Sequence, residues 1–193
     1  MADHAFTALR TDRLVLRRFR PEDLDTFVAY RSDPEVARYQ SWEAPYSRAE
    51  AARFLAELQV THPDTPGEWF QFAVALRRTE ELIGDCGAHV EADDPRQAEI
   101  GFTVAPDHQG NGYASEAVRR LLDYLLVERG KHRVHASCDD RNRRSAALLE
   151  RVGMRREGHL LESTWSKGQW TSDLLYAVLR RDWPPPAGAA SGG

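Results

Sequence analysis

The sequence predicts a mixed α/β (α+β) fold, with one central β-sheet flanked by helices. Strand-like apolar runs recur along the 193 residues, amphipathic helix patterns separate several of them, and one run leads through a glycine-rich turn directly into a helix. Apolar residues make up 41% and charged residues 29% of the chain, which is ordinary for a globular protein. Length and composition suit a single domain over residues 1–183.

The predicted strands are short apolar runs bounded by polar or turn-forming residues. They cover residues 14–17, 69–76, 82–90, 100–104, 134–138 and 171–179. A short charged loop joins the second of these runs to the third, and this pattern predicts an antiparallel hairpin.

The predicted helices carry apolar residues at helical spacing. They cover residues 21–31, 47–58, 114–126 and 145–152. Pro21 and the acids after it mark the start of the first helix, and Asp33-Pro34 is expected to end it. Ser47 and Glu50 form a capping-box pair at the start of the second, and Gly153 closes the last.

Several classes of protein lack support in the sequence. The N-terminus has no signal pattern and no uncharged apolar run is long enough to cross a bilayer, so we expect a cytoplasmic protein. Cys86 and Cys138 lie far apart in strand-like runs, and we expect two buried free thiols. The net charge of −4 gives no reason to expect nucleic-acid binding. Residues 184–193 contain only Pro, Gly, Ala and Ser and predict a disordered tail.

The most informative segment is the turn Gln109-Gly110-Asn111-Gly112-Tyr113-Ala114-Ser115, between a strand and a helix. Such a junction aims unpaired backbone N–H groups and the positive end of the helix dipole at one point, and glycines leave room for a phosphate. The turn therefore predicts a site for a phosphorylated cofactor, with a simple chain reversal as the alternative. A Walker loop needs Lys where Tyr113 stands, and a dinucleotide fingerprint needs Gly or Ala where Ser115 stands.

The same turn resembles the acyl-coenzyme A loop of the GNAT acetyltransferases. In that loop Gln or Arg is followed, after two variable residues, by Gly, a variable residue, and Gly or Ala. Gln109, Gly112 and Ala114 occupy these positions. Asn111 stands where the family often has a basic residue, so Arg143 or Arg144 is the alternative cation for the coenzyme phosphates, unless both lie on a solvated face.

Two further segments extend the resemblance to roughly residues 9–183. Residues 139–154 resemble the Asn-x-x-Ser segment of the same superfamily and its later Gly-Phe pair, with Asn142 and Ser145 in place and Met154 replacing the phenylalanine. Residues 10–23 resemble the opening of the branch that includes the ribosomal-protein N-terminal (alanine/serine) acetyltransferases.

The resemblance implies a fold and an activity. Two neighbouring parallel strands, ending near Val104 and around His135, would splay apart to form the acyl-CoA cleft. The chain would transfer an acetyl group from the cosubstrate acetyl-CoA to a primary amine, by direct attack in a ternary complex and without a metal. The resemblance also makes a homodimer plausible. The residues implied in cofactor binding are Phe102, Thr103, Val104, Gln109, Gly110, Asn111, Gly112, Tyr113, Ala114, Ser115, Asn142 and Ser145.

The resemblance also implies two catalytic residues. Glu99, just before the glycine turn, is the candidate base, working through a water; its alternatives are a solvated strand-end carboxylate, or Asp85 or His89 as the base. Ser145 is the candidate donor to the coenzyme A sulfur, because the family's tyrosine a few residues later is absent; its alternative is a helix cap or a surface hydroxyl.

The identity of the acceptor amine stays open in the sequence. A peptide N-terminus, a polyamine and an aminoglycoside are the acceptor classes considered. Aromatic residues that would line the acceptor groove or belong to the core are Tyr39, Trp42, Tyr46, Trp69, Trp165 and Trp170, and acids that would attract a cation are Glu43, Asp85, Glu91 and Glu162. Alternative functions are transfer of succinyl or another acyl group from coenzyme A, and a non-catalytic coenzyme A sensor.

Overall fold

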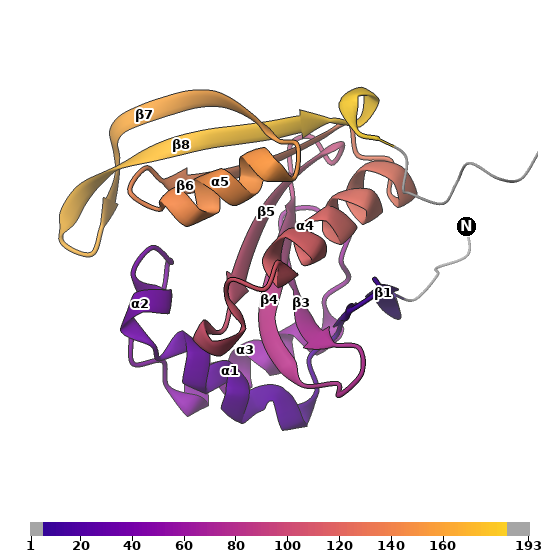
Figure 1. Cartoon of the computed structure of the whole chain (residues 1–193), viewed down its shortest axis with the longest axis vertical. Helices are drawn as coiled ribbons and strands as arrows, with labels where there is room; N and C mark the ends of the chain where they lie inside the picture. Colours follow the sequence, from indigo (N-terminus) through magenta and orange to yellow (C-terminus); the bar gives the residue numbers. More distant parts are fainter. Residues whose placement is uncertain (1–5, 185–193) are drawn as a thin grey trace, which may run out of the picture.

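A computed structural model describes residues 6–184, and within them the strands form a single mixed sheet (Figure 1). Its strand order is β1-β2-β3-β4-β5-β6-β8-β7. The strands are β1 (Ala8–Arg10), β2 (Leu14–Arg17), β3 (Trp69–Leu76), β4 (Leu82–Val90), β5 (Gln97–Val104), β6 (Arg133–Asp139), β7 (Arg155–Ser166) and β8 (Gln169–Leu179). The prediction of a central sheet flanked by helices is confirmed.

Helices lie on both faces of this sheet (Figure 1). The helices are α1 (Leu24–Arg31), α2 (Pro34–Ala37), α3 (Arg48–Val60), α4 (Tyr113–Asp123) and α5 (Arg143–Arg151). Short 3-10 turns cover Pro21–Asp23, Pro106–His108 and Arg180–Asp182, and a π-helical turn over Tyr124–Glu128 continues α4. Within residues 6–184, none of the helices combines the length and the apolar character that crossing a membrane requires.

Two apolar clusters hold these layers together. On one face, α4 and α5 bury side chains such as Leu121 and Leu149 against the sheet. On the other face, α1 and α3 bury Phe27 and Leu55 against a smaller part of the sheet around Ala73. Each fully buried leucine or phenylalanine stabilises the fold by about 2 kcal/mol, so the sheet is held from both sides.

Alternation along β5 sorts its residues between the two faces. Ala98 and Ile100 are buried in the cluster that contains α4. Because successive side chains of a strand point to opposite faces, Glu99 and Gly101 lie on the other face, where α1 and α3 cover only part of the sheet.

The parallel strands β5 and β6 pair over a short stretch and then separate. Their partners are Gln97 with Arg133, Ala98 with Val134, and Glu99 with His135. Beyond Glu99, β5 stays paired with β4 as far as Val104, while β6 stays paired with β8 as far as Asp139. The sheet therefore opens between β5 and β6, as the family resemblance implied.

Some local expectations were wrong. Asp33-Pro34 does not only end a helix, because Asp33 caps α2 by accepting hydrogen bonds from the N–H groups of Glu35 and Val36. The strands β1 and β7 were not expected from the sequence. Of the predicted disordered tail, residues 185–193 lie outside the described residues.

The cysteines are both free, but only one is fully buried. Cys86 is buried in β4, and burial raises the pKa of its thiol far above the usual range. Cys138 in β6 is only partly buried, and partial burial raises its pKa to about 11. The expectation of two buried thiols is therefore wrong for Cys138, which packs at the margin of the larger cluster.

Candidate active site

The glycine turn reaches α4 through two left-handed residues. Gly110 has a φ of 79° and Gly112, at the N-cap of α4, a φ of 78°. Glycine adopts these angles without the steric cost that a Cβ atom imposes. Apart from its two chain neighbours, no atom of residues 6–184 would lie within 4 Å of a Cβ added at Gly110, so the space in front of the turn is open there.

The turn presents a set of unpaired backbone donors. Among the described residues, none of the N–H groups from Gly110 to Ser115 donates a hydrogen bond to the protein, and the N–H of Glu116 is the first to do so, to the Gly112 carbonyl at 3.1 Å. These donors lie at the positive end of the α4 dipole. The turn is therefore suited to hold a diphosphate.

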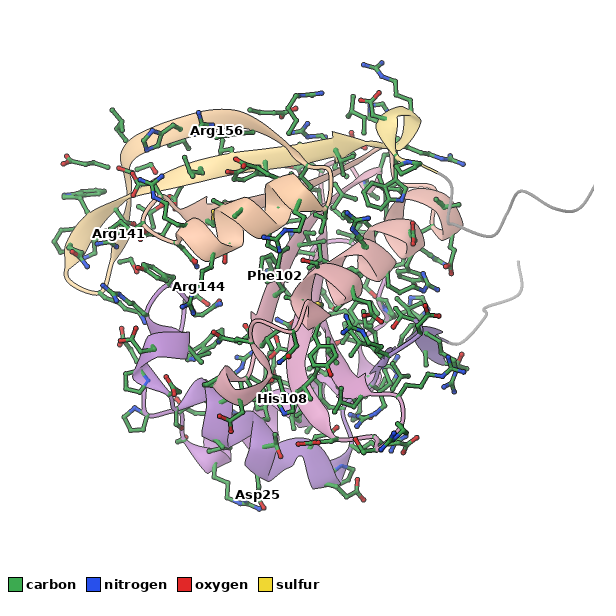
Figure 2. All side chains as sticks on the ribbon, viewed as in Figure 1. Asp25, Phe102, His108, Arg141, Arg144 and Arg156 are labelled. Carbon is green, nitrogen blue, oxygen red and sulfur yellow. The ribbon has the colours of Figure 1, made fainter. Side chains whose placement is uncertain are left out.

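Gln109 fixes the turn to its surroundings through its side chain. Its Nε2 donates to the Val104 carbonyl at 3.0 Å, and its Oε1 accepts from Arg144 Nη1 at 3.3 Å. Asn111 Nδ2 donates back to the carbonyls of Gln109 and His108, so its amide is used within the turn. Arg144, shown on α5 in Figure 2, thereby contacts the turn, and its role as a cation for the coenzyme phosphates stays a prediction.

Arg13 is a residue at this turn that the sequence analysis missed. Its Nη1 donates to the Asn111 carbonyl at 3.0 Å, and its guanidinium lies 4.7 Å from the centroid of the Tyr113 ring. Glu116 accepts from both the backbone N–H and the Nε of Arg13. The contact joins residues about 100 positions apart, so no local pattern indicated it.

A cleft with a volume of about 80 Å³ lies where β5 and β6 separate. Both strands, α5 and the segment after α2 contribute to it. Its lining residues are Tyr39, Gln40, Ile100, Gly101, Phe102, Ala136, Ser137, Cys138, Asp139, Asn142, Ser145 and Leu149. Figure 2 labels Phe102 on β5 beside this opening.

The β5 edge of the cleft offers backbone groups. The Gln97 carbonyl and the Ala105 N–H bond to the β4 side. Backbone polar groups alternate along a strand, so those of Phe102 and Val104 point toward β6, which has already separated. Thr103 has its backbone toward β4 and its side chain buried, so it faces away from the cleft. The Val104 carbonyl already accepts from Gln109 Nε2, and the remaining unpaired groups on this edge can bond the amides of an extended ligand.

Glu99 lies at the point where the strands part. The Oγ of Ser137, a residue of the cleft, lies 3.5 Å from Glu99 Oε1. Glu91 Oε1 lies 3.0 Å from His135 Nε2 and 3.9 Å from His89 Nδ1. One carboxylate oxygen of Glu91, one of Glu99 and one ring nitrogen of His89 all lie within 4.8 Å of one another. Glu99 is therefore one member of a polar group beside the cleft, and the sequence analysis did not anticipate Ser137 in it.

Asn142, and not Ser145, caps α5 with its side chain. Asn142 Oδ1 accepts a hydrogen bond of 3.2 Å from the Ser145 N–H. Both residues line the cleft, and no hydrogen bond of the Ser145 hydroxyl is found among the described residues. The helix-cap alternative for Ser145 is thus wrong, and its hydroxyl is left for a ligand in the cleft.

Asp85 is unsuited to act as a base or to attract a cation. It is 2% exposed, accepts a 2.5 Å hydrogen bond from the Tyr30 hydroxyl and pairs with Arg31 at 3.6 Å. Burial raises the pKa of the Asp85 carboxyl, against the opposing effects of Arg31 and Tyr30, and burial also raises the pKa of Tyr30 well above its usual value. The three side chains form a closed structural group.

The candidate acceptor aromatics divide by environment. Tyr39 lines the cleft, while Tyr46 packs against the cluster under α1 and α3, and Trp42 stacks on the Arg31 guanidinium. Trp165 and Trp170 contact each other near the tip of the β7–β8 hairpin and are 61% and 57% exposed, so neither belongs to the core.

Comparison with known proteins identifies the family. Residues 13–155 match the model of the acetyltransferase (GNAT) domain. An uncharacterized N-acetyltransferase, p20, of Bacillus licheniformis is 31% identical over 175 residues, 91% of this chain and 97% of that protein. A ribosomal protein uS5-alanine N-acetyltransferase of Escherichia coli (strain K12) is 26% identical over 181 residues, 92% of this chain and 93% of that protein. The structure of a GNAT-family acetyltransferase from Bacillus anthracis matches with a TM-score of 0.81 and 27% identity, over 91% of this chain and 99% of that chain. The chain belongs to the GNAT family of N-acetyltransferases.

Proposed function

We propose that this protein transfers an acetyl group from acetyl-CoA to a primary amine, by direct attack of the amine in a ternary complex. The observation that carries the proposal is the unpaired donor set from Gly110 to Ser115 beside the separated strands β5 and β6. The donors suit the diphosphate of coenzyme A, and the open edge of β5 suits the amides of its pantetheine arm.

Acetyl-CoA supplies an activated thioester carbonyl. Glu99 accepts, through a water, the proton that a protonated amine must lose before its nitrogen can attack that carbonyl. The N–C bond then forms and the C–S bond breaks. A second proton leaves the attacking nitrogen and ends on the coenzyme sulfur, so the products are an amide, a free thiol and one released proton.

Ser145 assists the departure of the sulfur by donating a hydrogen bond to it. Two observations support this role: the residue lines the cleft, and its hydroxyl is not used to cap α5. The backbone N–H groups of Phe102 and Val104 are placed to bond the thioester carbonyl and the nearest pantetheine amide, because both point into the gap beside β6.

We assign the acceptor to two classes, a protein N-terminus or a small cationic amine. Similarity to a ribosomal protein uS5-alanine N-acetyltransferase supports the first class. The carboxylates of Glu91 and Glu99, which have no Arg or Lys partner within 4.0 Å among the described residues, support a cationic acceptor in either class.

A panel of amines and acyl donors tests the proposal. Thiol release would be followed with acetyl-, succinyl- and longer acyl-coenzyme A against N-terminal peptides, polyamines and aminoglycosides. We expect turnover with acetyl-coenzyme A and at least one amine. Preferential turnover of succinyl-coenzyme A would mean that the protein transfers succinyl and not acetyl groups. Coenzyme A binding without turnover of any pair of acyl donor and amine would indicate a sensor.

A further inference from the structure

The sheet face opposite α4 carries ordered rows of side chains across β3, β4 and β5. One row consists of Trp69, His89 and Glu99, with His135 of β6 at its end. The next row consists of Gln71, Gly87 and Gly101. The row after that consists of Ala73, Asp85 and Thr103, and it is covered by α1 and α3.

The middle row contains two glycines and therefore lies lower than the rows on either side of it. We call the surface of Gln71, Gly87 and Gly101 the floor. The side chain of Gln71 fills the space above Gly87. A Cβ added at Gly87 would lie 2.7 Å from Gln71 Oε1 and 3.0 Å from a ring carbon of Trp69. At Gly101 an added Cβ would meet nothing within 4 Å. Gly101 also lines the cleft between β5 and β6, so this open floor joins the cleft directly.

The groups around this floor favour a cation. Gln71 Oε1, which fills the space above Gly87, has no hydrogen-bond partner among the described residues, so an N–H donor that approached it from the Gly101 side would satisfy it. Glu91 and Glu99 lie on one side, and within residues 6–184 neither has an Arg or Lys partner, although Glu91 contacts His135 and His89. The nearby cations are already paired, Arg31 with Asp85 and Arg133 with Glu157. The ring of Trp69, 42% exposed, adds a face that can lie against an ammonium group.

We propose that the row of Gln71, Gly87 and Gly101 is the acceptor site, and that it takes a primary amine on a slender chain that bears a second positive charge. The reacting amine passes over Gly101 to reach Glu99 and the cleft, and the second charge is held by Glu91. This inference rests on the proposed function and adds to it the path of the acceptor and its chemical class.

Side chains added at Gly101 test the proposed path of the acceptor amine. Gly101 lies in a strand, does not have a positive φ and has open space above it, so Gly101→Ala and Gly101→Val should fold normally. We expect kcat/KM for an amine to fall by about 10-fold or more in the valine variant, from lost near-attack geometry, and by less in the alanine variant. Coenzyme A affinity by calorimetry and the melting temperature should stay at the wild-type values.

Removing the carboxylate at Glu91 tests the chemical class. We expect 1,4-diaminobutane to be a better acceptor than 1-aminobutane by about 10-fold, the size of one charge-assisted contact, and Glu91→Gln to abolish that preference. Glu57→Gln, on the exposed side of α3, is the matched control and should keep it.

The outcomes separate the two proposals. A wild-type protein that neither binds coenzyme A nor acetylates any amine overturns the proposed function. An active wild-type protein whose Gly101→Val variant keeps its kcat/KM, or loses coenzyme A binding instead, overturns only the acceptor path. Equal rates for the two butylamines, or an unchanged preference in Glu91→Gln, overturn the dicationic class.

Discussion

Glu99 and His135 face each other at the last position where β5 and β6 pair. Beyond this pair, β5 pairs only with β4 and β6 pairs only with β8 among the described strands. The Glu99 carboxylate therefore stands at the vertex of the opening, 3.5 Å from the hydroxyl of Ser137, which lines the cleft. A proton acceptor at this position is adjacent to both the cleft and the open sheet face.

Replacing Glu99 by Gln should slow turnover without weakening coenzyme binding. A glutamine keeps the size of the side chain but cannot accept the proton of the amine, so we expect kcat to fall by about 100-fold or more. The measurement is steady-state thiol release at saturating acetyl-CoA, with coenzyme A affinity by calorimetry beside it. Glu57→Gln serves as the control, and a Glu99→Gln enzyme with wild-type kcat would remove Glu99 from the mechanism.

Substitutions at Ser145 and Asn142 should change different properties, the catalytic rate for Ser145 and the stability of α5 for Asn142. Ser145→Ala removes a hydroxyl that does not cap α5, so we expect kcat to fall by about 10-fold or more with an unchanged melting temperature. Asn142→Ala removes the cap, which should cost about 1 kcal/mol and lower the melting temperature by about 2–4 °C. Thermal unfolding and initial rates on both variants check this, and a destabilised Ser145→Ala protein would return the serine to a structural role.

Local signals in the sequence were sufficient for part of the fold. The capping box of Ser47 and Glu50 and the glycine turn before α4 act within a few residues, and both are present as expected. The start of α2 was missed because Asp33-Pro34 is read as a helix stop, although the same pair supplies an N-cap and an N1 proline. The strand β7 was missed because it is an edge strand with mostly exposed residues, so it lacks the alternation that marks a half-buried strand.

Long-range contacts limited the prediction of the site. The separation of β5 from β6 was expected only through the family resemblance, since nothing in either strand alone specifies where pairing ends. Arg13 reaches the glycine turn from the other end of the chain, and Ser137 reaches Glu99 from β6. Asp85 appeared available in the sequence because its partners, Tyr30 and Arg31, lie more than 50 residues earlier.

Arg13 should contribute to coenzyme affinity by holding the glycine turn. Arg13→Gln removes its hydrogen bond to the Asn111 carbonyl, its pairing with Glu116 and its contact with Tyr113. We expect the Kd for coenzyme A to rise about 5-fold, which corresponds to the ~1 kcal/mol of one such contact. Calorimetry measures it, with Arg10→Gln, an exposed arginine in β1, as the control. An unchanged Kd in Arg13→Gln would show that the turn keeps its shape unaided.

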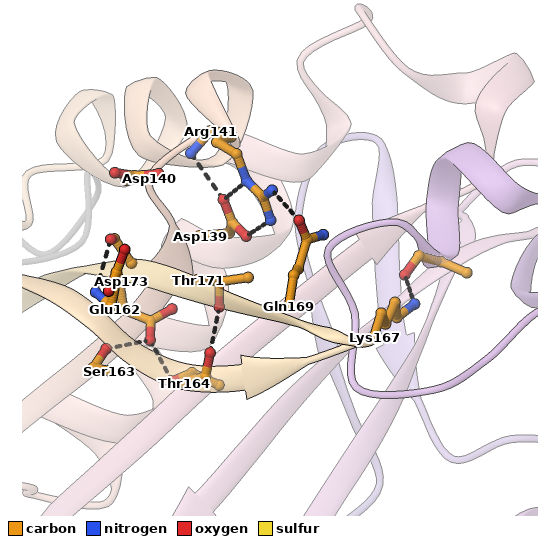
Figure 3. A network of polar contacts seen from close by, with 12 residues as sticks. Asp139, Asp140, Arg141, Glu162, Ser163, Thr164, Lys167, Gln169, Thr171 and Asp173 are labelled. Carbon is orange, nitrogen blue, oxygen red and sulfur yellow. Dashed lines mark hydrogen bonds and ion pairs between the residues drawn. The ribbon is translucent and has the colours of Figure 1, made fainter.

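Lys167 should hold the segment that carries the cleft residues Tyr39 and Gln40. Lys167, labelled in Figure 3, lies at the tip of the β7–β8 hairpin, and its Nζ donates to the carbonyls of Ala37 at 2.6 Å and Trp42 at 2.8 Å. The hairpin and the segment after α2 are thus joined across the chain (Figure 1).

Lys167→Met should release this segment while the rest of the fold persists. We expect faster amide hydrogen exchange in residues 37–46 and a loss of stability on the order of 1 kcal/mol, because the contact is largely exposed to solvent. Arg156→Met removes a cation of the same hairpin that forms no side-chain hydrogen bond or ion pair with residues 37–42 in the described part of the chain, and it should leave exchange there unchanged. Equal exchange in both variants would mean that the lysine does not restrain the segment.

Asp64 should make stability depend on acid pH. It pairs with Lys131, whose side chain is 6% exposed, at 2.5 Å, and also with Arg129. Partial burial acts to raise the pKa of Asp64, but the hydrogen bonds from Lys131 and Arg129 outweigh it and lower that pKa below the usual value.

A carboxylate whose pKa is lower in the folded state than in the unfolded chain stabilises the fold above the unfolded value, about 3.9. That contribution is lost as the pH falls from this value through the lowered pKa. Asp64→Asn should therefore cost about 2 kcal/mol of unfolding free energy at pH 7, because Lys131 is left buried without its charge partner, and progressively less below about pH 4. Urea unfolding of both proteins at pH 7 and pH 3 measures the difference. Asp93→Asn, at an exposed aspartate, should show no such dependence, and a gap that persists unchanged at pH 3 would assign the effect of Asp64 to packing and not to its charge.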